Sequence, residues 1–273
     1  MKFKPVLTYL ILPLLCYILS TERATANHLD GRGTHWAYST WLGTGVYKLN
    51  QEDMFILSLA GDLPLNKDPD LVYQLVGGLT IGLDNYGLKN IEIKFPDGVS
   101  SLQFTPGFQV TYRVHKRWYI KPFSQIGMGT SFVGGDDVYM FAAGAKSIYR
   151  ASLKTLNIEI GNQLMTARHI DGSLSPDIFG KFDTGLNIKL PYSVSVFDTA
   201  LDLNLFVMYT LFTSRVDELF TSHESSTAPL SWLGQLGFDV GKVSETKTIR
   251  AGFRYVFGED NLTGVRLNLG FPF

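Results

Sequence analysis

The side chains best suited to catalysis are two histidines, His169 and His223, each with acidic residues and serines close by in the sequence. Their acidic neighbours are Asp171, Asp177, Asp217, Glu218 and Glu224. A serine, a histidine and a carboxylate can together perform acyl transfer, with serine as the nucleophile and histidine as its base. No nucleophile elbow or HExxH motif accompanies these residues. We therefore interpret both histidines as solvated loop residues and predict no catalytic residue, metal ligand or cofactor.

A larger set of charged residues, eight basic and five acidic, recurs at alternating positions along the chain. Its members are Arg113, Lys121, Lys146, Glu159, Lys181, Asp183, Lys189, Asp198, Asp202, Asp239, Arg250, Arg254 and Arg266. Gathered in a confined space, these groups could form an ion-paired and hydrated filling, a narrow pore that favours anions, or a catalytic group. We favour the ion-paired filling, which would make the surrounding structure rigid.

The elements that must position these charges are amphipathic β-strands. Between residues 71 and 83 the odd positions are almost all apolar, whereas the even ones include Gln74 and Thr80. Such a period of two places apolar and polar side chains on opposite faces of a strand. The same alternation occurs at 102–115, 178–190, 230–241 and 248–257. The charges of the set fall on the polar faces.

Residues 1–26 have the features of a secretory signal peptide. Two lysines near the start precede a largely apolar segment at 5–20, and Ala24 and Ala26 form an A-x-A cleavage site. An anchoring helix is the alternative, but the apolar segment is shorter than the ~20 residues that a span requires. Cleavage after Ala26 leaves residues 27–273 as one large domain.

Composition excludes several classes of function. The single cysteine, Cys16, leaves with the predicted signal peptide, so the mature chain has no disulfide and no thiolate metal site. The precursor has 24 basic and 25 acidic residues, and cleavage leaves 21 and 24, a net charge of −3. This balance gives no indication of nucleic-acid binding. Beyond the signal peptide, no apolar segment is long enough for a transmembrane helix.

An exported chain of amphipathic strands predicts an all-β fold, a transmembrane up-and-down antiparallel β-barrel. An arginine or lysine that faces lipid costs about 2–4 kcal/mol at the bilayer midplane, so the charged set must face the barrel interior, or lumen. We place twelve strands at 35–48, 53–62, 71–84, 102–114, 117–132, 137–149, 153–166, 177–190, 194–212, 230–242, 247–257 and 262–273.

The lengths of the connections support an even strand number. With both termini in the periplasm, turns follow even strands and outside loops follow odd strands. The three longest connections, 86–101, 167–176 and 213–229, all follow odd strands. The predicted periplasmic turns are short, at 63–70, 115–116, 150–152, 191–193 and 243–246.

The carboxy-terminal strand ends on an aromatic residue. Its apolar face consists of Val265, Leu267, Leu269, Phe271 and Phe273. Such an end is typical of the closing strand of bacterial outer-membrane barrels and resembles the signal that the barrel-assembly machinery reads. We therefore predict that Leu269, Phe271 and Phe273 act as the assembly signal. Other aromatic residues are interpreted as membrane-interface anchors, namely Trp36, Trp41, Trp118, Trp232, Tyr112, Tyr139, Tyr149 and Tyr255.

Several of these stretches resemble autotransporter-type β-domains, in particular solitary autotransporter-like barrels of Gram-negative bacteria. They are residues 41–46, 119–129 and 252–255, followed by 267–273. The resemblance covers nearly the whole mature chain. It implies a barrel that a passenger segment would traverse. Only about eight residues precede the first predicted strand, however, too few to cross ~25 Å of membrane as a helix. We therefore expect no covalent passenger domain.

We expect an integral outer-membrane barrel with a structural or transport-related role and no enzymatic activity. Its expected partners are outer-membrane lipids and the barrel-assembly machinery. The alternatives are a small-solute channel with a charged lumen and an outer-membrane hydrolase that acts on lipid or peptide. Conductance measurements distinguish the channel, and a turnover assay with His169 and His223 replaced distinguishes the hydrolase.

Overall fold

The computed structural model describes residues 40–41, 43–49, 52–84, 101–132, 137–153, 156–170, 178–196, 199–212, 231–243 and 248–269. All of them belong to a compact unit formed by residues 33–273. The predicted signal peptide with Ala24 and Ala26, and the terminal Phe271 and Phe273, lie outside the described residues. Within the described ranges, no helix has the length and apolar character needed to cross a bilayer.

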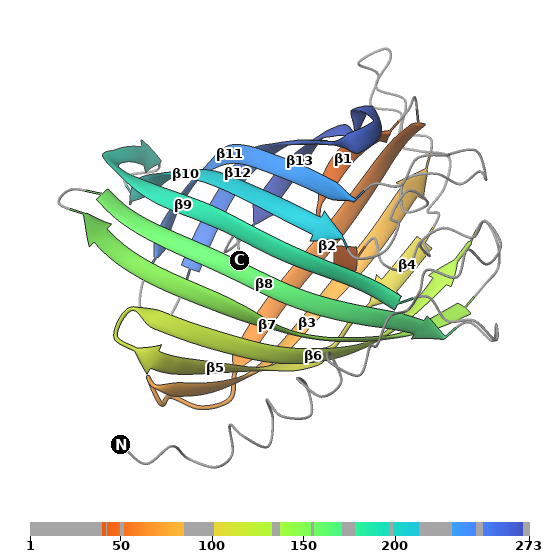
Figure 1. Cartoon of the computed structure of the whole chain (residues 1–273), viewed down its shortest axis with the longest axis horizontal. Helices are drawn as coiled ribbons and strands as arrows, with labels where there is room; N and C mark the ends of the chain where they lie inside the picture. Colours follow the sequence, from red (N-terminus) through yellow and green to blue (C-terminus); the bar gives the residue numbers. More distant parts are fainter. Residues whose placement is uncertain are drawn as a thin grey trace. The chain divides into compact units, whose positions relative to one another are not determined.

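The described residues form one antiparallel sheet that closes on itself (Figure 1). Its strands are β1 Gly45–Leu49, β2 Glu52–Pro64, β3 Leu71–Asp84, β4 Ser101–Phe104, β5 Gly107–His115, β6 Trp118–Ser131, β7 Asp137–Leu153, β8 Leu156–Ile170, β9 Ile178–Val196, β10 Thr199–Phe212, β11 Trp232–Val243, β12 Thr248–Gly258 and β13 Thr263–Leu269. A short 3-10 helix, Glu259–Asn261, joins β12 to β13. The first and last strands pair, with Val46 opposite Val265, and this pairing closes the barrel.

The thirteen described strands occupy twelve positions in the ring, because β4 and β5 share one position. Both segments pair with β3 on one side and with β6 on the other. The break between them contains Pro106, which has no N–H group to donate to a neighbouring strand. Thr105 nevertheless exchanges backbone hydrogen bonds with Gly78 across the break. The predicted all-β, twelve-strand barrel is therefore confirmed.

Strand β10 illustrates how the barrel separates an apolar outer face from a mixed inner face. On β10, Leu205, Val207, Tyr209 and Leu211 are exposed, and the alternating residues Asn204, Phe206, Met208, Thr210 and Phe212 are buried. Exposed apolar side chains cover a sheet only where the surrounding medium is itself apolar or a partner covers them. The outer face is thus suited to lipid, as in a barrel that spans a bilayer.

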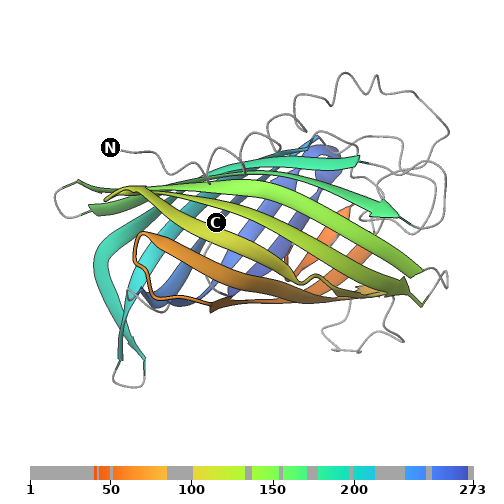
Figure 2. The same ribbon diagram turned by 90° about the horizontal axis from the view of Figure 1, so that it is seen from below.

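The hairpin of β9 and β10 differs from the prediction. Residues 191–193 were expected to form a turn, but β9 continues to Val196, which pairs with Thr199 of β10. The reason is a β-bulge, in which the residues between Lys189 and Ser193 lie opposite the single residue Leu203. Pro191 falls inside this bulge, where a missing N–H group is tolerated. Among the described residues, β9 has no partner on β8 beyond Lys189, and the β9–β10 hairpin extends past the neighbouring strands (Figure 2).

Three other boundaries also differ. The predicted turn at 150–152 belongs to β7, because Arg150 pairs with Glu159 across the hairpin. Strand β8 reaches Ile170 and so includes His169, which was predicted to lie in a loop. The predicted first strand at 35–48 is wrong at its start, since Thr40 and Trp41 form a 3-10 turn and β1 begins at Gly45.

Candidate functional site

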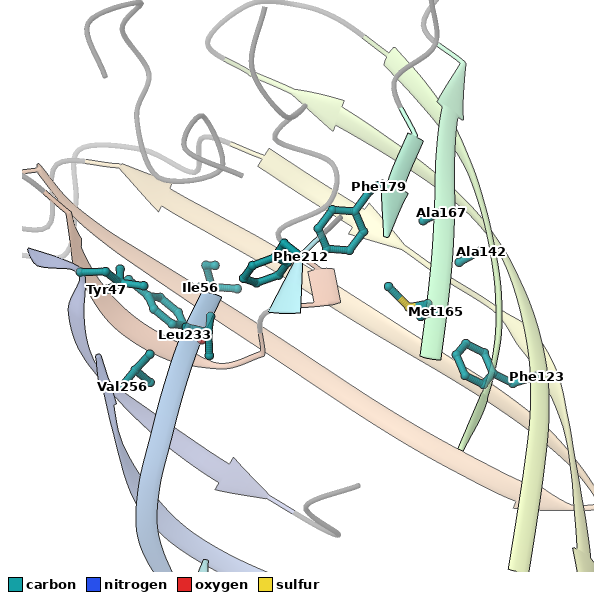
Figure 3. Close-up of a cluster of buried hydrophobic side chains, with 11 residues drawn as sticks. Tyr47, Ile56, Phe123, Ala142, Met165, Ala167, Phe179, Phe212, Leu233 and Val256 are labelled. Carbon is teal, nitrogen blue, oxygen red and sulfur yellow. The ribbon is translucent and has the colours of Figure 1, made fainter. Parts of the chain in front are cut away.

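The barrel interior is the candidate site, because the inward-facing side chains of the strands project into it. Part of this interior is apolar, which the alternation did not predict. A buried cluster includes Tyr47 and Ile56 on β1 and β2, Met165 on β8, and Phe179 and Phe212 on β9 and β10. The rings of Phe179 and Phe212 lie next to one another, with centroids 5.9 Å apart (Figure 3). The apolar cluster excludes water from part of the interior.

Trp41 crosses this interior. Its ring stacks on Phe179 of β9 with centroids 6.1 Å apart. Its indole N–H donates to Gln125 Oε1 on β6 over 3.2 Å, and its carbonyl oxygen accepts from Lys181 Nζ on β9 over 3.3 Å. It also packs against Val138 and Met140 on β7. Trp41 therefore lies inside the barrel, and its prediction as a membrane-interface anchor is wrong.

Hydroxyl groups hold the chain around Trp41 to β2 and β3. Thr40 Oγ1 and Thr80 Oγ1 of β3 are 2.8 Å apart, and Thr80 donates to Ser58 Oγ of β2 over 3.1 Å. Thr44 Oγ1 donates to the carbonyl of Ser58 and accepts from its N–H, over 2.7 and 2.8 Å. Because β3 and β9 are nearly opposite in the ring, the Thr40–Trp41 turn spans the interior from wall to wall.

Gly43 is required at the end of this turn. Its φ of +89° lies in the left-handed region, which glycine adopts without strain. A Cβ atom there would lie 2.1 Å from Nη2 of Arg266. The Gly43 carbonyl accepts a hydrogen bond of 2.9 Å from the hydroxyl of Tyr47. These contacts direct the chain from the β1 wall into the interior.

Most of the predicted interior charges are paired in the structure. The shortest contacts are 2.7 Å for Lys189–Asp202, 2.8 Å for Arg150–Glu159, 2.9 Å for Lys181–Asp183, 3.2 Å for Arg113–Asp70 and 3.8 Å for Arg250–Asp239. The Lys181–Asp183 pair is deeply buried, with side chains 11% and 7% exposed. Asp198 lies outside the described residues. Four of these five pairs join neighbouring strands or successive inward positions of one strand, and the fifth joins β5 to Asp70 just before β3.

Four basic residues of the set form two pairs in which like charges lie directly opposite on neighbouring strands. Lys121 lies directly opposite Lys146 on β6 and β7, and Arg254 lies directly opposite Arg266 on β12 and β13. The Lys146 ammonium lies 5.8 Å from the ring centroid of Phe123, a cation–π contact. Like charges directly opposite on neighbouring strands destabilise a sheet unless other groups compensate them.

Sequence reasoning missed several polar partners of these charges. Arg150 was assigned to a turn, but it pairs with Glu159 and lies 5.2 Å from the Tyr119 ring centroid. Thr210 donates to Asp183 over 2.6 Å, and Asn204 donates to Asp239 over 2.9 Å. Their inward positions on β10 follow from its alternation, so the signal was present for Asn204 and Thr210. The contacts themselves depend on strand register, which the sequence alone does not specify.

The loop histidines are not assembled into a site by the described residues. His223 and its acidic neighbours lie outside them, as do Asp171 and Asp177. His169 is placed in β8 by its backbone alone. In the ranges that the structure covers, no group of three or more histidine, cysteine or acidic side chains is positioned to hold a metal ion.

At the barrel rim, the carboxylate of Glu259 has a lowered pKa. The backbone N–H and the hydroxyl of Ser231 both donate to Glu259 Oε2 in the β12–β13 connection. These hydrogen bonds favour the charged carboxylate and lower the pKa of Glu259 below its ordinary value. They join the start of β11 to the 3-10 helix, so this rim is held by a charged anchor at neutral pH.

Among the comparisons with known proteins, the comparison with solved structures supports the fold. No protein-family profile matches the chain, and no curated protein sequence matches it. Among solved structures, it is similar to the β domain of the Bordetella autotransporter BrkA, with a TM-score of 0.53 and 12% sequence identity. The match covers 84% of this chain and 96% of the BrkA domain. The chain therefore has the barrel fold of an autotransporter β domain, as the resemblance in sequence predicted.

Proposed function

We propose that this chain is an integral outer-membrane β-barrel protein of Gram-negative bacteria, with a structural or transport-related role and no enzymatic activity. The apolar outer face supports a membrane location, and the predicted signal peptide supports export. The likeness in fold to an autotransporter β domain supports the same class of barrel. Insertion by the barrel-assembly machinery and the absence of a passenger stay predictions.

The Thr40–Trp41 turn carries the functional part of the proposal. Trp41 contacts β6, β7 and β9, and Thr40 is tied to β3, so together they obstruct the lumen. The apolar cluster around Trp41 would also hinder the passage of hydrated ions. We propose that the barrel is closed at rest, which favours a structural or gated role over a permanently open channel.

Replacing Trp41 by alanine tests this closure. The purified barrel should conduct little in a planar bilayer, and Trp41→Ala should open a lasting ion conductance, because it removes the largest side chain of the turn. Trp118→Ala is the matched control, since Trp118 lies on the wall, 39% exposed, and donates only to Ser147 Oγ of β7 among its described hydrogen bonds.

The control should conduct as little as the natural chain. A natural barrel that conducts steadily, with no change in Trp41→Ala, would contradict closure and favour the small-solute channel. Turnover of lipid or peptide that is lost on replacing His169 or His223 would instead favour the hydrolase.

A further inference from the structure

Two arginines lie side by side in one transverse row of the inner wall. The register places Phe206 of β10, Gly237 of β11, Arg254 of β12 and Arg266 of β13 in succession, and Gly45 of β1 follows. Glycines thus flank the arginine pair on both sides. A Cβ atom at Gly45 would come within 2.9 Å of Arg266 Cγ, so the glycine leaves room for that side chain to lie along the wall.

Both guanidinium groups share one neutral acceptor. Gln235 Oε1 accepts from Arg266 Nη1 over 2.9 Å and from Arg254 Nη1 over 3.4 Å. Arg254 is only 4% exposed, and its Nη2 is buried with no hydrogen-bond partner among the described residues. The face of its guanidinium lies over the Phe206 ring, with Cζ 4.1 Å from the centroid. The ring covers one face of Arg254, so further polar partners must approach the edge of the guanidinium.

The nearby carboxylates are already occupied. Asp239 pairs with Arg250 and accepts from Asn204, and Asp183 pairs with Lys181 and accepts from Thr210. In the part of the chain that the structure describes, neither Arg254 nor Arg266 has a carboxylate within ion-pair distance. Two adjacent positive charges in a largely buried setting repel one another, and desolvation adds to this cost.

We propose that Arg254 and Arg266 bind a small doubly charged oxyanion of the phosphate or sulfate type inside the barrel. Each guanidinium offers a planar fork of N–H donors, which matches the oxygen atoms of a tetrahedral anion. The anion supplies the negative charge that the pair lacks, and it provides acceptors for Nη2 of Arg254. Gln235 fixes both forks on the wall through its amide oxygen.

The test is equilibrium dialysis of the folded barrel, in zwitterionic detergent, against radiolabelled inorganic sulfate. Ionic strength is kept constant with chloride, so that screening does not vary. The natural barrel should bind one sulfate saturably, and inorganic phosphate should compete. Arg254→Gln should weaken sulfate binding by at least about tenfold, because it removes charge-assisted hydrogen bonds.

Gln235→Glu is the decisive variant, since it keeps the shape of the side chain and places a carboxylate beside both guanidinium groups. It should fold, resist unfolding better than the natural barrel at low salt, and lose sulfate binding. Lys189→Gln is the control, because it removes a half-exposed positive charge that is paired with Asp202, and sulfate binding should not change. Three results would each overturn the proposal. Chloride could compete with sulfate as well as phosphate does, sulfate binding to the natural barrel could fail to saturate, or Gln235→Glu could still bind sulfate.

Discussion

Replacing Gly252 by valine should strongly destabilise the native closed barrel. Gly252 is buried on β12, opposite Asp239 of β11. A Cβ atom there would lie 2.1 Å from the carbonyl oxygen of Phe238 and 2.5 Å from Cα of Asp239. Both atoms belong to the backbone of the neighbouring strand, which cannot move away without breaking the ladder. We expect a loss of at least about 3 kcal/mol in the free energy of unfolding.

The matched control for Gly252→Val is Gly61→Val. Gly61 is an exposed strand glycine on β2, and beyond its own chain neighbours no atom lies within 4 Å of the position that its Cβ would take. The control should fold with a change within about 0.5 kcal/mol. Urea unfolding in short-chain lipid, followed by the mobility shift of unheated protein on gels, measures both variants. Equal behaviour of the two variants would show that the close β11–β12 approach is not required.

Replacing Asp183 by asparagine should destabilise the barrel by about 3 kcal/mol. Asparagine keeps the shape of the side chain but leaves the buried Lys181 ammonium, which lies 2.9 Å from the carboxylate, without its countercharge. The hydrogen bond from Thr210 is also weakened, because its acceptor loses its charge. Urea unfolding at neutral pH measures the loss.

The double variant Lys181→Met with Asp183→Leu distinguishes the net contribution of the ion pair from the cost of leaving one buried charge unpaired. It removes both charges, so it should lose far less stability than the sum of the two single variants. An exposed ion pair contributes less than about 1 kcal/mol to the free energy of unfolding. A loss that small for Asp183→Asn would contradict the burial of the Lys181–Asp183 pair.

The alternation of side chains predicted the barrel because lipid and lumen impose opposite requirements on successive residues. Leu205 and Val207 are exposed and Asn204 is buried, as a period of two requires. The strand count was also predictable, since the three longest connections, 86–101, 167–176 and 213–229, all follow odd strands. The turn predicted around Pro191 was wrong, because a β-bulge accommodates a residue without an N–H group as well as a turn does.

The interior could be predicted only in composition. The sequence indicates that Lys181 and Asp183 face inward, but their pairing with each other rather than with neighbouring strands depends on rotamers and register. Trp41 was misassigned because an aromatic residue near the start of a strand is typical of a membrane-interface anchor. Among the described residues, the 3-10 turn at Thr40 and the left-handed Gly43 direct that segment into the lumen, and neither has a strong sequence pattern.

Closure of the barrel between its first and last strands is tested most directly by a disulfide across that seam. Val46 and Val265 are directly opposite on β1 and β13, and the Cα separation of opposed antiparallel residues, ~4.5–5.5 Å, allows a disulfide. The mature chain contains no other cysteine if the predicted signal is cleaved. In isolated outer membranes, the Val46→Cys and Val265→Cys double variant should form an intramolecular disulfide on mild oxidation. The cross-linked chain should migrate faster on denaturing gels until it is reduced. Val46→Cys with Val207→Cys, which join β1 to the non-adjacent β10, should remain reduced. An uncross-linked seam in outer-membrane fractions, or equal cross-linking of both pairs, would contradict the closed barrel.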